Sequence, residues 1–247
     1  MLSPKRVFDH GGAVRRPPYR RLAAELRDLL LYRPAAPDPR SLPQGAGLRV
    51  LVIPALLTDD AATGSLRRFL DRCGFRTFAW TIGINWGPTP RILRSLRERL
   101  CVVAADGPVS VVGVSLGGVL ARDLAYDHPH RISRVVTIAS PIALPTASTL
   151  RPLVSLLMPF YSADADIARL SSPMPVPSTA IYTRDDGIVA WETCLGRDPN
   201  CTNVEVTGPH LPICRNPEVL RRIVEALLSP AGENARSELP GNGPIER

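Results

Sequence analysis

From residue 48 onward the chain alternates between two hydrophobic patterns. Short runs such as LRVLVIP (48–54) are apolar without a polar face, as expected for strands that are covered on both sides. Longer segments such as 89–104 carry apolar residues at intervals of three and four, which is the spacing of an amphipathic helix. Strands are therefore predicted at 48–54, 75–80, 108–114, 132–140, 178–184 and 203–208. Helices are predicted at 60–73, 89–104, 115–129 and 217–229.

This alternation predicts one domain over 46–229, of the α/β class, with a mostly parallel, doubly wound sheet of about six strands and helices on both flanks. The segment 141–177 interrupts the pattern with seven prolines and the apolar piece LVSLLMPFY, which indicates an inserted lid. Residues 1–45 are expected to form an N-terminal arm with one helix at 20–31. Residues 230–247 lack core-forming side chains and are expected to be a disordered tail.

The composition narrows the class of protein. A chain of 247 residues with 45% hydrophobic and 21% charged residues suits one globular domain. No apolar run is long enough for a transmembrane helix, and no apolar stretch follows the basic residues at the N-terminus. We therefore expect no secretory signal and a cytoplasmic location.

The net charge of +7 is concentrated in the N-terminal arm. Residues 1–45 hold nine basic and four acidic residues, whereas the rest of the chain is nearly neutral. All basic residues except Lys5 are arginine, a bias that a GC-rich coding sequence explains better than a phosphate-binding surface does. The charge therefore predicts no nucleic-acid partner, and at most a weak contact of the basic arm with a membrane surface.

The five cysteines match no zinc-binding spacing, so no metal site is predicted. Cys73 and Cys101 lie in apolar helical patterns and are expected to be buried. Cys194, Cys201 and Cys214 are expected in loops, where either one disulfide or free thiols are compatible with the sequence.

The segment Gly113-Val114-Ser115-Leu116-Gly117, followed by Gly118, carries the clearest chemical signal. An apolar strand ends at Val114 and an amphipathic helix begins at Leu116, so Ser115 lies at a sharp strand-to-helix turn. Such a turn is strained and needs small neighbours two residues before and after the serine, and it exposes the hydroxyl. The alternative interpretation is a glycine-rich turn that grips a phosphate or allows tight packing.

With this turn and the alternation over 48–229, the chain resembles the α/β-hydrolase superfamily, and in detail small bacterial esterases and lipases. The resemblance leaves out the N-terminal arm and the tail. It implies an α/β-hydrolase fold, a nucleophile, acid and histidine in that order along the chain, and hydrolysis of carboxylic esters with hydrophobic acyl or alcohol groups. The family's first two strands have no counterpart here, so we expect the helix over 18–33 to cover that edge of the sheet.

The resemblance places the histidine after the last strand, where His210 lies, and places Ser115 as the nucleophile. His128 and His130 precede a strand and are expected at the opposite end of the sheet. Asp185 and Asp186 both follow the strand 178–184; the similar segment of these esterases reads Asp-Gly-x-Val, which favours Asp186 as the acid.

Two backbone amides are expected to bind the oxyanion, those of Leu116 and Leu56. The family usually has His-Gly or Pro-Gly before the second amide, whereas this chain has Pro54-Ala55. Apolar residues that flank these loops are candidates for the substrate pocket, although each could equally belong to the core. They are Leu57, Thr58, Ile142, Leu144, Leu156, Met158, Phe160, Ile188, Val189, Trp191 and Leu211. Trp86, in GINWGPTP, is expected either as a binding aromatic or as a cover for the strand edge.

The sequence carries no phosphate-binding loop, dinucleotide fingerprint or zinc-protease motif, so no cofactor is predicted. The expected substrate is a small-molecule or lipid ester. A thioesterase, lactonase, amidase or acyltransferase with the same three residues remains an alternative, as does a non-catalytic binding protein with this fold.

Overall fold

The computed structural model describes residues 14, 16–143, 147–162, 169 and 172–230. Within them lies a sheet of six parallel strands in the order β2-β1-β3-β4-β5-β6. The strands are β1 (Arg49–Ile53), β2 (Arg76–Phe78), β3 (Val109–Val114), β4 (Ile132–Ile138), β5 (Ser178–Thr183) and β6 (Cys201–Val206). Each overlaps a predicted strand, although β6 begins at Cys201, two residues before the predicted strand and in a segment expected to be a loop. The fold class is confirmed.

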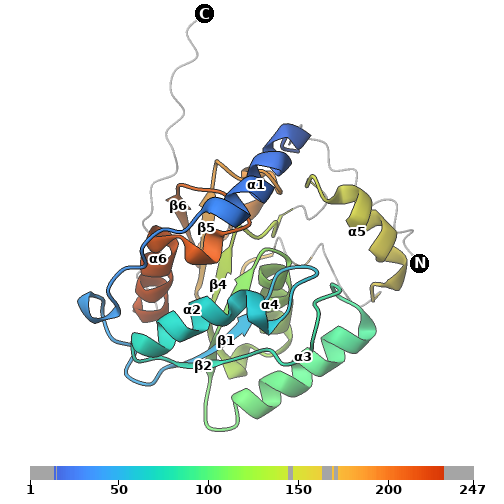
Figure 1. The fold of residues 1–247 in the computed structure, drawn as a ribbon. Helices are drawn as coiled ribbons and strands as arrows, with labels where there is room; N and C mark the ends of the chain where they lie inside the picture. Colours follow the sequence, from blue (N-terminus) through green and yellow to red (C-terminus); the bar gives the residue numbers. More distant parts are fainter. Residues whose placement is uncertain (1–13, 15, 144–146, 163–168, 170–171, 231–247) are drawn as a thin grey trace, which may run out of the picture.

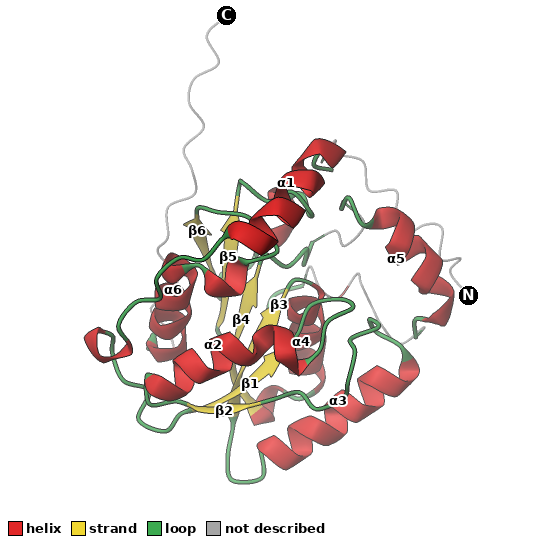
Figure 2. Ribbon diagram, viewed as in Figure 1, coloured by secondary structure: helices red, strands yellow, loops and turns green. Residues whose placement is uncertain are grey.

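Helices cover both faces of the sheet, as Figure 2 shows. α2 and α6 pack on one face through one hydrophobic cluster, and α3 and α4 pack on the other face through a second cluster. The helices are α1 (Tyr19–Leu31), α2 (Asp60–Arg72), α3 (Pro90–Val103), α4 (Leu116–Asp127), α5 (Arg151–Leu157) and α6 (Pro217–Leu228). This arrangement explains why the central strands are apolar on both faces.

Local signals in the sequence set the helix ends. Thr89 accepts a hydrogen bond from the Ile92 N–H at the start of α3, and Asn216 accepts one from the Glu218 N–H at the start of α6. A proline follows each of these capping residues, where its fixed φ suits the first turn and its missing N–H costs nothing.

The first turn of α4 lies unusually close to the strands beside it. Ser115 has φ +50° and ψ −121°, and a Cβ on Gly113 would lie 2.4 Å from the Gly117 carbonyl oxygen. A Cβ on Gly117 would in turn lie 2.5 Å from the carbonyl oxygens of Ile53 and Pro54. Only glycine fits these positions, because the colliding atoms belong to the backbone.

The position of α1 corrects one expectation. The helix does not cover the free edge at β2; it lies over the loops that follow β5 and β6 (Figure 1). Leu22 packs there in a cluster with Tyr182 and Leu211, and the Arg21 guanidinium donates to the Arg184 carbonyl. Over these loops α1 therefore finds both an apolar cluster to pack against and a hydrogen-bond acceptor.

Part of the predicted lid is described. Within 141–177 the chain forms α5 and a 3-10 turn over Met158–Phe160, and α5 stands apart from the sheet in Figure 1. The lid function of this segment stays a prediction, and the predicted tail falls outside the described residues except for Pro230.

The cysteines are all free thiols. Cys73, Cys194 and Cys201 are buried, but Cys101 is exposed, contrary to the expectation, because it lies on the solvent side of α3 beside the exposed Val102. Among the described helices, none combines the length and hydropathy needed to cross a bilayer.

We predict that Gly113→Ala lowers the free energy of unfolding by about 1–3 kcal/mol or more, because its methyl group would overlap the backbone of α4. Gly64→Ala is the control: it lies within α2, and its Cβ would meet only the flexible ends of Arg68, at 3.3 Å, and Arg67, at 4.0 Å. Urea denaturation followed by circular dichroism measures both variants. Wild-type stability of Gly113→Ala would contradict the close approach described above.

Candidate active site

Three polar side chains from distant parts of the chain meet at the carboxyl end of the sheet. Ser115 follows β3, Asp186 follows β5 and His210 follows β6, and parallel strands bring these loops to one edge. The Nε2 atom of His210 lies 3.1 Å from the Ser115 Oγ atom, and its Nδ1 atom lies 2.6 Å from the Asp186 Oδ2 atom. The three side chains thus form a continuous hydrogen-bonded chain.

The imidazole is 5% exposed and its pKa reflects two opposing influences. Burial lowers the pKa, while the charge and hydrogen bond of Asp186 and the charge of Glu25 raise it. The net result is a pKa above the usual value of 6.5. Asp186 is itself fixed, because its Oδ1 atom accepts the N–H groups of Ile188 and Val189, each at 2.8 Å.

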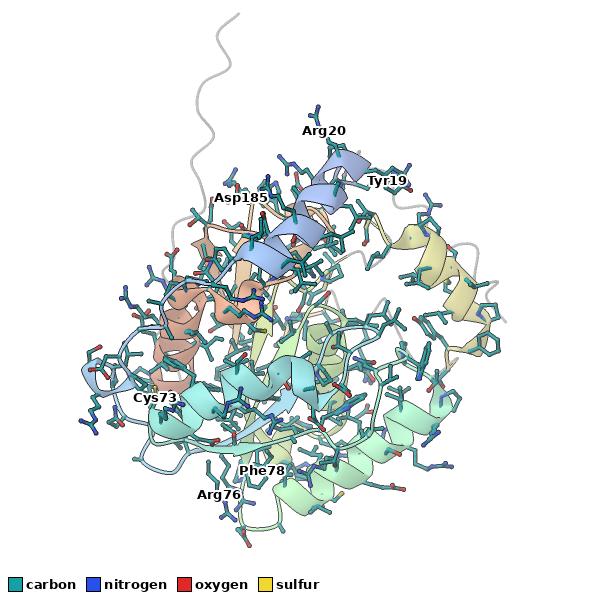
Figure 3. The ribbon with its side chains drawn as sticks, viewed as in Figure 1. Tyr19, Arg20, Cys73, Arg76, Phe78 and Asp185 are labelled. Carbon is teal, nitrogen blue, oxygen red and sulfur yellow. The ribbon has the colours of Figure 1, made fainter. Side chains whose placement is uncertain are left out.

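The neighbouring carboxylate makes a different contact. Asp185 accepts a hydrogen bond from the Gly208 N–H at 2.9 Å, two residues before the histidine. It is exposed, and Figure 3 shows it beside α1. Of the two acids that the sequence left open, Asp186 is therefore the one that contacts the imidazole, and Asp185 holds the histidine loop.

The two backbone amides that the sequence predicts for the oxyanion are those of Leu56 and Leu116. Both residues are half-buried, and neither N–H has a hydrogen-bond partner among the described residues. The loop after β1 that carries Leu56 lies against Gly117, in contact with the first turn of α4. Free backbone N–H groups are what an oxyanion site requires, and this role of the two amides stays a prediction.

A buried asparagine that the sequence analysis did not single out holds this loop. Asn85 is 0% exposed; its side-chain NH₂ donates to the Pro54 carbonyl at 2.7 Å, and its backbone carbonyl accepts the Leu57 N–H at 2.8 Å. Its side-chain oxygen accepts the Gly87 N–H at 2.9 Å. The only sign of this role in the segment GINWGPTP was the amide side chain of Asn85 itself.

The predicted pocket residues divide by burial. Ile142, Ile188 and Val189 are core residues, and Trp191 is half-buried and stacks on Tyr182. Leu57, Leu156 and Phe160 are exposed. Thr58, Met158 and Leu211 are half-buried, and Leu144 lies outside the described residues.

A cavity of about 540 Å³ lies between the loop before α3 and the end of α5. Of the predicted pocket residues Phe160 lines it, and Trp86, expected either as a binding aromatic or as a cover for the strand edge, lines it as well. The rest of its wall was not anticipated. Its lining comprises Ile82, Gly83, Ile84, Trp86, Thr89, Arg91, Ile92, Leu157 and Phe160. Ser115, Asp186 and His210 do not line the cavity, but Asn85 connects its Ile84–Trp86 wall to the loop of Leu56.

His128 and His130 lie in the turn before β4, at the opposite end of the sheet, where their rings contact edge to face. Within the part of the chain that the structure describes, no three His, Cys, Asp or Glu side chains are grouped so that they could hold a metal ion.

Solved structures, and not sequence comparisons, show which known proteins this chain is similar to. No protein-family model matches the chain, and no curated protein is similar to it in sequence. Solved structures do match. An alpha/beta superfamily hydrolase from Oenococcus oeni PSU-1 aligns with a TM-score of 0.58 at 13% identity, covering 75% of this chain and 94% of that one.

Two further structures are similar. A metagenome-derived lipolytic enzyme aligns with a TM-score of 0.55 at 14% identity over 75% of this chain and 95% of that one. Paleococcus ferrophilus monoacylglycerol lipase gives a TM-score of 0.53 at 16% identity over 75% and 96%. The chain therefore has the α/β-hydrolase fold.

We predict that Asp186→Asn lowers the pKa of the His210 imidazole, because the substitution removes the negative charge at 2.6 Å that stabilises the imidazolium. Asp185→Asn is the matched control: it contacts the Gly208 N–H and should leave the pKa close to that of the wild type. NMR titration of the histidine side chains measures both. Equal shifts in the two variants would contradict this assignment of the carboxylates.

Proposed function

We propose that the protein is a serine hydrolase that cleaves carboxylic esters through an acyl-enzyme. The observation that carries the proposal is the hydrogen-bonded chain from Ser115 through His210 to Asp186, with the hydroxyl at a strained turn. A neutral imidazole at 3.1 Å can take the hydroxyl proton, and a buried carboxylate stabilises the imidazolium that results.

The proposed reaction has two stages. Ser115 Oγ attacks the ester carbonyl carbon while its proton passes to His210 Nε2, and the oxyanion accepts the Leu56 and Leu116 N–H groups. The C–O bond to the alcohol breaks as His210 returns the proton to the leaving oxygen, which leaves an acyl group on Ser115. Water, deprotonated by His210, then attacks the acyl carbon, and the carboxylic acid and the free serine hydroxyl are released.

Hydrophobic esters are the proposed substrates. The cavity beside the oxyanion loop has a largely apolar wall that includes Ile84, Trp86 and Leu157, and such a wall favours an alkyl chain over a charged group. Two of the structurally similar proteins are described as lipolytic or as a monoacylglycerol lipase, which agrees with this proposal. Small-molecule and lipid esters both fit it, and a weak membrane contact of the N-terminal arm stays part of the proposal.

We predict that Ser115→Ala reduces hydrolysis of p-nitrophenyl esters at least about a thousandfold and abolishes labelling by a fluorophosphonate probe. Ser133→Ala is the control, because Ser133 is exposed at the start of β4, at the other end of the sheet. Unchanged hydrolysis by Ser115→Ala would refute the proposal.

A panel of ester, thioester, lactone and amide substrates on the wild-type protein determines which bond it cleaves best.

We predict that Leu157→Glu raises KM for p-nitrophenyl octanoate much more than for the acetate, because a carboxylate would enter the cavity that we assign to the alkyl chain. The matched control is Leu156→Glu on the same helix, since Leu156 is 69% exposed and does not line the cavity. Steady-state kinetics measure both variants. If the two substitutions have equal effects on both esters, the alkyl chain binds elsewhere.

A further inference from the structure

A buried carboxylate on α1 contacts both loops of the candidate site. Glu25 is 2% exposed, and its Oε1 atom accepts the Gly187 N–H at 2.8 Å and the His210 N–H at 2.9 Å. Its Oε2 atom accepts the Leu211 N–H at 2.9 Å. One side chain thus joins the loop after β5 to the loop after β6, and it lies more than 160 residues before either loop in the sequence.

These contacts are specific in geometry. Gly187 directly follows Asp186, and the other two amides belong to His210 and its neighbour, so each bond is made within one residue of the proposed acid or base. A Cβ on Gly187 would lie 2.7 Å from the Glu25 Cγ atom and 2.9 Å from the Arg21 carbonyl oxygen. The acid loop therefore needs glycine here for α1 to approach this closely.

A general contribution to stability does not require a carboxylate at this place. Burial of a charge is costly unless it is paired and hydrogen-bonded, and an apolar side chain among Leu22 and its neighbours would serve packing alone. Among the described residues no cation forms a salt bridge with Glu25; its bonds are to the three backbone amides. The Glu25 carboxylate is therefore stabilised by the amides of the two loops, and it in turn holds those loops.

We propose that Glu25 is a positioning residue: by accepting three amide N–H groups it holds the acid loop and the histidine loop at the separation that the Asp186–His210–Ser115 chain requires. This inference rests on the proposed hydrolase function for its kinetic consequence. Its structural and electrostatic consequences do not depend on which bond the protein cleaves.

Two negatively charged groups act on the His210 imidazole. Asp186, from the loop after β5, contacts Nδ1 directly, and Glu25, from α1, lies on the main-chain side of the same residue. Both raise the pKa of the imidazole and oppose the effect of burial. Removal of the Glu25 charge should consequently lower that pKa, and the acidic limb of the pH–rate profile should move to lower pH with it.

The test compares Glu25→Gln with Glu25→Asp and with Asp28→Asn. Glu25→Gln removes the charge and places an amide NH₂ where one donor now binds. Glu25→Asp keeps the charge but withdraws it by one methylene. Asp28→Asn is the matched control on the same helix, because the Asp28 carboxylate bonds only to Arg27 among the described residues.

We expect Glu25→Gln to lower kcat on a p-nitrophenyl ester by about ten- to a hundredfold with little change in KM, and to move the acidic limb to lower pH. Glu25→Asp should lose part of kcat with the limb unmoved, and Asp28→Asn should behave like the wild type. A Glu25→Gln variant within twofold of wild-type kcat, with an unmoved limb, overturns the proposal.

Two measurements make the proposal independent of folding of the variants and of ester hydrolysis. In the wild-type protein, the Gly187, His210 and Leu211 amides should be protected from hydrogen exchange, and exchange as fast as in open loops overturns the proposal. NMR titration of His210 reports the electrostatic effect even if no ester is cleaved. An inactive wild type with protected amides would refute the hydrolase function and leave the role of Glu25 in the loops intact.

Discussion

The close approach of the first turn of α4 to the ends of β1 and β3 is the constraint on which the site depends. Gly113 and Gly117 carry no side chains, and a Cβ at either position would collide with neighbouring backbone atoms. Because these side chains are absent, the backbone can bend sharply at Ser115 and present its hydroxyl at the carboxyl edge of the sheet. The same contact brings the loop of Leu56 against the turn. The proposed nucleophile and the proposed oxyanion amides therefore depend on the same backbone arrangement.

Around this rigid centre, the loops are held by buried polar side chains and not by hydrophobic packing alone. Asn85 joins the loop after β1 to the wall of the cavity, and Glu25 joins the loops after β5 and β6. Each has its hydrogen bonds satisfied, as buried polar groups must. Loops fixed in this way can keep 3 Å contacts between side chains, which hydrophobic contacts, being non-directional, specify less sharply.

The position of α1 follows from the same principle. Its exposed residues include Tyr19, Arg20 and Leu30, and Arg20 projects away from the body in Figure 3, whereas Leu22 and Glu25 face the loops. The helix takes the place where its one buried acid finds amide donors. The helix does not lie at the free edge at β2, so the expectation that α1 covers that edge was wrong.

Hydrophobic periodicity in the sequence determined the six strands, their flanking helices and the turn at Ser115, because these features depend on residues close together in the chain. The sequence left Asp185 and Asp186 as alternatives, with Asp186 favoured by the resemblance, and it did not identify Asn85, Glu25 or most of the cavity wall. The tertiary structure decided these, since a hydrogen bond between residues 25 and 210 leaves no local pattern. Spacing along the chain reports which face of an element is buried, but only the folded backbone determines which distant donor meets which acceptor.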